Sequence, residues 1–146
     1  MRLTVLLVVV IVFVAAAGAQ DAISKDMAQL EGEWSMVSAE ANGQTVPEEV
    51  VKTGKRVVKG DETTVSLGDR VLMKAKFAVD PSKKPKTIDY TVSEGPSKGK
   101  VVKGIYELNG DTVKFCFSGP DKDRPSEFSA PAESGRTYSV WKKAKK

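Results

Sequence analysis

Short stretches in which apolar and polar residues alternate fill most of the chain after its apolar N-terminal segment. Such a period of two is typical of strands that bury one face. Turn pairs such as Gly60-Asp61 and Gly119-Pro120 separate these stretches. The pattern predicts eight strands, of which the first begins at Glu33 and ends near Asn42-Gly43, and the others are Lys55–Lys59, Thr63–Leu67, Val71–Val79, Thr87–Val92, Val101–Leu108, Thr112–Ser118 and Arg136–Lys142.

Two short helices are predicted beside the strands. Ser24 can cap a helical turn that runs to Leu30, with Asp26 near its positive end, and Pro47 can begin a brief helix that ends at Lys52. Neither is long enough for a crossover between parallel strands, so neighbouring strands should be antiparallel. The expected fold is all-β, closed as a barrel or folded as a sandwich. We favour an antiparallel eight-stranded barrel, because eight strands enclose side chains or one small ligand.

The Asn109-Gly110 pair predicts the register of one hairpin, because this dipeptide suits a two-residue type I′ turn. The face that points inward would then carry nearly continuous apolar pairs, with an aromatic ring over a glycine. These pairs are Leu108 with Asp111, Tyr106 with Val113, Gly104 with Phe115 and Val102 with Phe117. The opposite face, which carries Ile105 with Lys114 and Lys103 with Cys116, should be wetter.

The N-terminal segment has the three parts of a secretory signal peptide. Arg2 supplies the positive start, Leu3–Val14 is apolar, and Ala17-Gly18-Ala19 offers small residues for cleavage. Residues 1–19 are therefore expected to be removed, which leaves 20–146 as a single domain that is secreted or periplasmic and not stably inserted in a membrane. The alternative is a retained anchor, because Leu3–Ala19 just reaches the roughly 17 residues that span a bilayer.

Composition narrows the classes of function. The 146 residues are 40% hydrophobic and 29% charged, which fits one globular domain. Histidine is absent, so the commonest acid–base residue and zinc ligand is missing. The net charge of +4 comes from scattered lysines without a nucleic-acid-binding module. We therefore predict no catalytic residue, metal site or cofactor, no nucleic-acid partner, and hence a protein that is not an enzyme.

Four passages resemble a known family: Gly32–Glu40, Asp80–Asp89, Gly104–Thr112 and Arg124–Phe128. In order along the chain they are similar to the secreted, uncharacterised lipocalin-like domain family that is abundant in planctomycete bacteria. The resemblance implies a lipocalin-like barrel and no established activity. Gly32-x-Trp34 also resembles the first-strand signature of lipocalins. That signature implies a tryptophan across the closed end of the barrel, with a basic residue of the last strand against it, for which Arg136 and Lys142 are the candidates.

Inward aromatic residues and one arginine are the candidates for ligand binding. Arg124, in the long connection before the last strand, can orient an anionic group, or it can pair with Glu127 or another acid and hold the connection down. The aromatic residues can line a pocket, or they can simply form the core. The candidates are Trp34, Phe77, Tyr90, Tyr106, Phe115, Phe117, Arg124 and Tyr138.

Cys116 is the single cysteine of the chain. If Lys103 lies opposite it, the nearby ammonium group would lower the pKa of the thiol and make it reactive. The alternative is a small, half-buried strand residue without chemistry, which we favour.

Two functions follow from these features. The first is an exported lipocalin-like protein that binds a small apolar or amphipathic ligand in its barrel. The second is a cavity-free barrel that acts as an envelope or extracellular interaction module, with an unknown protein partner, through its lysine-rich surface.

Overall fold

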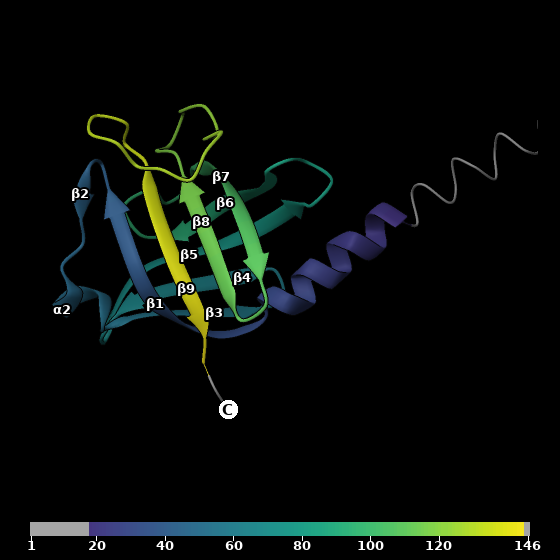
Figure 1. Cartoon of the computed structure of the whole chain (residues 1–146), viewed down its shortest axis with the longest axis horizontal. Coiled ribbons are helices and arrows are strands. Elements are labelled where there is room, and N and C mark those ends of the chain that lie inside the picture. Colours follow the sequence, from purple (N-terminus) through teal and green to yellow (C-terminus); the bar gives the residue numbers. More distant parts are fainter. Residues whose placement is uncertain (1–17, 145–146) are drawn as a thin grey trace, which may run out of the picture.

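The computed structural model describes residues 18–144, which contain nine strands and one core (Figure 1). All eight predicted strands are confirmed, with ends that differ by a few residues. A two-residue strand, β2, and the short helix α2 lie between the first two of them. The strands are β1 (Gly32–Ala41), β2 (Gln44–Thr45), β3 (Gly54–Lys59), β4 (Glu62–Leu67), β5 (Arg70–Asp80), β6 (Lys86–Glu94), β7 (Val101–Asn109), β8 (Thr112–Phe117) and β9 (Thr137–Lys143), and α2 is Glu48–Val51.

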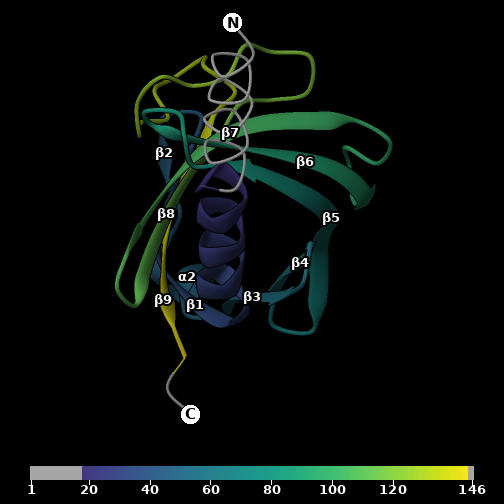
Figure 2. The ribbon, with the colours of Figure 1, turned by 90° about the vertical axis from the view of Figure 1, so that its right-hand side faces the viewer.

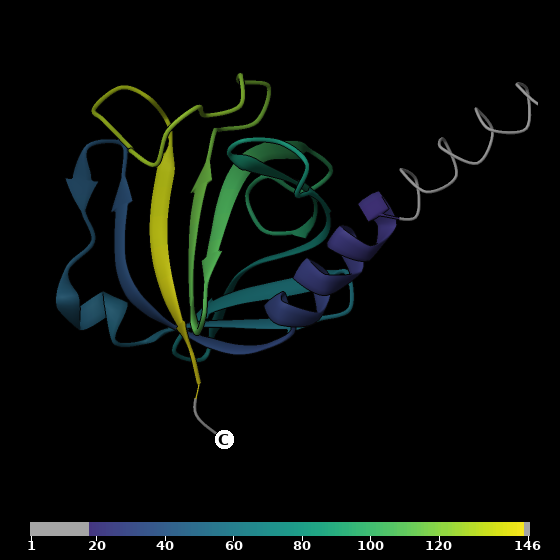
Figure 3. The same ribbon diagram turned by 45° about the vertical axis from the view of Figure 1, so that its right-hand side comes forward.

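The strands form a closed antiparallel barrel (Figures 1 and 3). Consecutive strands from β3 to β9 pair with each other, and β1 closes the barrel by pairing with both β3 and β9. The pairing of β1 with β9 shifts register between Met36 and Ser38, where the strand bends away from β3. β2 pairs only with the end of β1, so eight strands make the barrel wall. The predicted all-β, eight-stranded antiparallel barrel is therefore confirmed.

A helix that includes residues 18–30 packs against the barrel and leads into β1 (Figure 2). Ile23, Met27 and Leu30 lie at helical spacing and contact the core, and Leu30 is fully buried. The prediction that Ser24 caps this helix is wrong, because the helix continues on its N-terminal side. Among residues 18–144, none of the helices has the length and apolar character needed to cross a bilayer.

The predicted register of the β7–β8 hairpin is wrong by two residues. Asn109 pairs with Thr112, so the two-residue loop is Gly110-Asp111. Gly110 has a φ of +62°, and a glycine at the first loop position is typical of a type II′ turn. Because a shift of two preserves the face of each side chain, the inward residues are still those predicted. Phe117, not Phe115, consequently lies opposite Gly104.

The outer face of this hairpin is not wet where it was predicted to be. Ile105 and Cys116 pair with each other and are 1% and 0% exposed. The long connection between β8 and β9 covers them, since the Ser129 carbonyl accepts a hydrogen bond from Cys116 Sγ and Ala130 is itself buried. This connection is not part of the barrel wall, and it thus supplies a second apolar layer outside it.

Trp34 lies at the end of the barrel that faces the helix. Its Nε1 donates to the Leu30 carbonyl at 2.9 Å, and the side chain is 1% exposed. The basic partner from the last strand is Lys143, whose Nζ lies 5.3 Å from the ring centroid. The predicted partners Arg136 and Lys142 are therefore wrong, because the closure register pairs Trp34 with Lys143.

Candidate functional site

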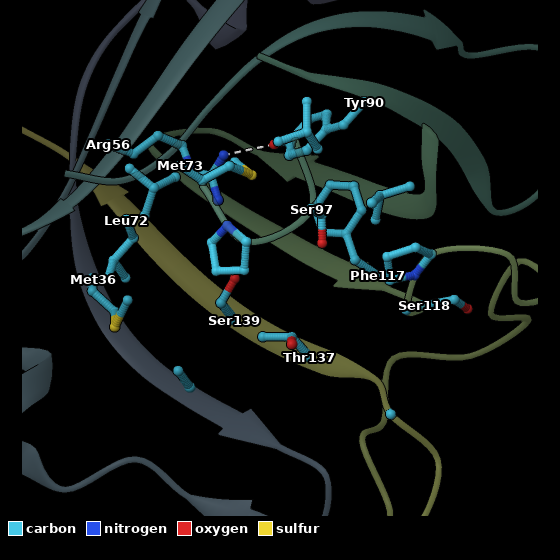
Figure 4. Close-up of a pocket in the computed structure, with 18 of the residues that line it drawn as sticks. Met36, Arg56, Leu72, Met73, Tyr90, Ser97, Phe117, Ser118, Thr137 and Ser139 are labelled. Carbon is cyan, nitrogen blue, oxygen red and sulfur yellow. Dashed lines mark hydrogen bonds between the residues drawn. The ribbon is translucent and has the colours of Figure 1, made fainter. Parts of the chain in front are cut away.

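The barrel encloses a pocket of about 400 Å³, which we call the barrel pocket (Figure 4). Loop residues at one end form its mouth: Pro96 and Ser97 come from the β6–β7 connection, and Gly119 and Pro120 come from the β8–β9 connection. The opposite end lies towards Trp34 and the helix. The described residues therefore leave a cavity in the barrel.

The walls of the barrel pocket are mainly apolar. Alternation along the strands creates them, since Ser139 and Trp141 of β9 line the pocket whereas Val140 between them does not. Two methionines supply flexible, polarizable side chains that adapt to ligands of different shape. The apolar side chains of the wall are Met36, Val65, Leu72, Met73, Val92, Val102, Phe117 and Trp141.

Arg56 of β3 is the charged residue in this wall. It is only 4% exposed, and its Nη1 donates to the Tyr90 hydroxyl at 2.6 Å (Figure 4). The same Nη1 donates to Thr63 Oγ1 at 3.2 Å. The guanidinium carbon lies 4.4 Å from the ring centroid of Phe115 and 4.6 Å from that of Trp141. Two rings and two hydroxyl groups therefore hold the cation in a fixed place.

No carboxylate within residues 18–144 forms an ion pair with Arg56, and its Nε has no hydrogen-bond partner there. Burial raises the pKa of Tyr90, so this phenol stays neutral and does not neutralise the charge. Burying an ion without a counter-ion costs several kcal/mol, of which each cation–π contact offsets about 2 kcal/mol. The site thus presents a positive charge without a counter-ion among the described residues, deep in an apolar pocket.

Two of the predicted ligand-binding residues, Tyr90 and Phe117, line the barrel pocket. Their ring centroids are 4.3 Å apart, so they form one aromatic surface. Phe115 lies beside this surface and contacts Arg56 rather than lining the pocket. These three residues are brought together as the inward pattern predicted.

The other predicted aromatic residues lie outside the barrel pocket. Trp34 and Phe77 are core residues, and Tyr106 donates a hydrogen bond from its hydroxyl to Asp26 Oδ2 at 2.7 Å. Tyr138 faces outward, where its ring packs against Phe128 at a centroid distance of 6.1 Å.

Arg124 is also outside the barrel pocket, and it holds the long connection against the wall. Its Nη2 forms an ion pair with Asp89 Oδ1 at 2.7 Å, and its Nη1 donates to the carbonyl groups of Gly104 at 2.8 Å and Ile88 at 3.2 Å. Its acidic partner is thus Asp89 and not Glu127, whose Oε1 instead accepts a hydrogen bond from Ser129. This geometry agrees with the alternative in which Arg124 pairs with an acidic residue and holds the connection down.

Cys116 lies opposite Ile105 and not Lys103, so the expected activating ammonium group is absent from its side. Burial raises the pKa of the thiol, and the lowering that an opposite Lys103 would cause does not apply here. The side chain is fully buried under the β8–β9 connection. Its surroundings are those of a structural cysteine.

Arg56 is the functional candidate that sequence reasoning missed. A signal for it exists, because Arg56 has the same strand parity as Val58, and both side chains point into the barrel. A charged residue at a buried position of an alternating strand marks either a satisfied ion pair or a binding site.

Comparisons with protein-family models, with curated proteins and with solved structures found no match for the chain. The resemblance to the lipocalin-like family therefore stays a prediction.

Proposed function

We propose that this chain is an exported, lipocalin-like binding protein that holds one small apolar or amphipathic molecule in the barrel pocket. The observation that carries the proposal is the pocket itself, because its volume of about 400 Å³ lies within the range of about 300–1,000 Å³ of ligand sites. Its walls are apolar with a few fixed polar groups, which is the usual composition of such sites. Binding rather than catalysis is proposed, because no acid–base pair faces the pocket among its lining residues.

Neighbouring residues of β7 allow a matched test. Val102 lines the barrel pocket, whereas Val101 is 50% exposed on the outer face. In a fluorescence titration with the neutral dye N-phenyl-1-naphthylamine, the wild-type chain should bind one dye molecule. Val102→Trp should weaken binding by about tenfold or more, because the indole occupies the pocket volume.

The control variant Val101→Trp should bind the dye with the wild-type Kd. Equal binding by all three chains would place the dye outside the barrel pocket and contradict the proposal. A wild-type chain that does not bind this dye would contradict the proposal and favour the interaction module instead.

A further inference from the structure

The barrel pocket contains a buried cation with free hydrogen-bonding capacity, and this feature defines a class of ligand. We infer that the pocket selects amphiphiles that carry one carboxylate, with the carboxylate bound to Arg56 and the apolar chain directed towards the mouth. The inference rests on the proposed function, since it requires that the pocket binds a ligand.

The hydrogen bonds of Arg56 leave a suitable edge for a carboxylate. Both bonds that its side chain donates to described residues leave from Nη1, and Nε is buried without a partner. A guanidinium group has five N–H donors in a plane, and its parallel N–H pairs match the two oxygens of a carboxylate. The Nε and Nη2 edge therefore lacks an acceptor among the described residues, and a carboxylate that reaches it can accept two parallel hydrogen bonds.

The groups around Arg56 stabilise a cation but supply no negative charge. Thr63 and Tyr90 accept hydrogen bonds as neutral hydroxyl groups, and Phe115 and Trp141 offer ring faces. Because the side chain is held from several sides, little further ordering is required when a ligand binds. Charges in such a buried site are also screened by salt far less than charges at the surface.

The position of Arg56 sets the orientation of the ligand. It pairs with Trp34 and Val65 in the wall, away from the loops that carry Pro96 and Pro120 at the mouth. When the anionic group of a ligand binds to Arg56, the rest of the ligand therefore lies along the methionine, leucine and valine side chains of the wall. A polar molecule without an apolar chain would leave these walls uncovered.

Decanoate and decanol are suitable probes, because they share one apolar chain and differ in the charged group. Each is titrated against a wild-type chain that is loaded with N-phenyl-1-naphthylamine, and the Kd is obtained from displacement of the dye. Decanoate should bind about 10- to 100-fold more tightly than decanol, the range for charge-assisted hydrogen bonds.

Three variants assign this preference to Arg56. Arg56→Met removes the charge but keeps an apolar side chain of similar length, so decanoate should lose its preference while decanol and the dye still bind. Arg56→Lys keeps the charge without the planar fork and should restore part of the preference. Arg70→Met, at an exposed arginine of β5, should behave as the wild type.

The outcomes separate the two proposals. If the wild-type chain binds the dye and decanol but does not prefer decanoate, the carboxylate inference is wrong and the binding barrel stands. If it binds none of the three probes, the proposed function fails as well. If circular dichroism shows that Arg56→Met does not fold, the inference is tested by the ratio of the decanol and decanoate Kd values in the wild type and in Arg56→Lys. If Arg56→Lys prefers decanoate as strongly as Arg70→Met does, a bidentate bond is contradicted.

Discussion

Gly104 shows how one residue shapes the wall of the barrel pocket. A Cβ atom at this position would lie 2.6 Å from Phe117 Cε1 and 2.8 Å from the Cys116 carbonyl oxygen, closer than real Cβ contacts. The glycine is therefore required by the ring that lies over it and not by a turn. Because Phe117 also packs against Tyr90, this contact positions the aromatic surface beside Arg56.

Gly104→Ala should lower the free energy of unfolding by about 1–3 kcal/mol, because the added methyl group displaces the Phe117 ring in a packed interior. Urea denaturation followed by tryptophan fluorescence measures the change. Gly119→Ala is the control, since its nearest neighbouring atoms would lie at 3.7 Å and 3.8 Å. Equal stability of the two variants would show that the ring moves aside without cost.

At the scale of elements, a buried polar contact fastens the helix of residues 18–30 to the barrel. Asp26 is 4% exposed, and its Oδ2 accepts hydrogen bonds from the Tyr106 hydroxyl at 2.7 Å and from Lys86 Nζ at 2.9 Å. Burial, together with the nearby carboxylate of Asp26, raises the pKa of Tyr106 above its ordinary value. The contact therefore depends on a neutral phenol.

The raised pKa of Tyr106 predicts a loss of stability at alkaline pH. Below about pH 10 the phenol of Tyr106 is protonated in both the folded and the unfolded chain. Above about pH 10 only the unfolded chain releases the proton. Stability should thus fall by about 1.4 kcal/mol per pH unit from this residue. Tyr106→Phe should be less stable than the wild type by about 1 kcal/mol at pH 8, and the difference should shrink or reverse at pH 11.

Urea denaturation at both pH values measures this difference. Tyr138→Phe, at a partly exposed tyrosine of β9, is the matched control. A difference between wild type and Tyr106→Phe that is the same at pH 8 and pH 11 would show that Tyr106 does not contribute to the alkaline transition.

At the scale of the molecule, the barrel is closed by residues far apart in the chain. β1 and β9 pair over most of their length, and the helix before β1 packs against the core. The helix residues in this packing are Ile23, Met27 and Leu30, which all follow Ala19. Removal of residues 1–19 would therefore leave every one of these contacts in place. Residues 1–17 of the predicted signal lie outside the described residues.

We expect the exported protein to begin at Gln20 and to have the stability of the full chain. Intact-mass analysis of the protein from the extracytoplasmic fraction of an expressing bacterium measures the first point, and urea denaturation of a chain that begins at Gln20 measures the second. Recovery of the full mass in the membrane fraction would instead show a retained anchor.

Much of the candidate site follows from the alternation of inward and outward residues along the strands, although its central residue, Arg56, was missed. Tyr90 and Phe117 were predicted to face inward because they alternate with polar neighbours. Arg56 shares that parity, but its charge concealed it, because arginine is expected at the surface. The position of Arg124 could not be predicted from periodicity, since the β8–β9 connection has no periodic pattern, and Tyr138 packs against Phe128 of that connection.

The sequence by itself determined the strands, their antiparallel order and the face that most strand side chains take, because these properties depend on residues close together in the chain. Only the tertiary structure decided the hairpin register, the partner of Trp34, the burial of Ile105 and Cys116, and the empty space around Arg56. Each of these depends on which distant segments meet. A cavity in particular is the volume that packed side chains from many strands leave unfilled, and no single segment encodes it.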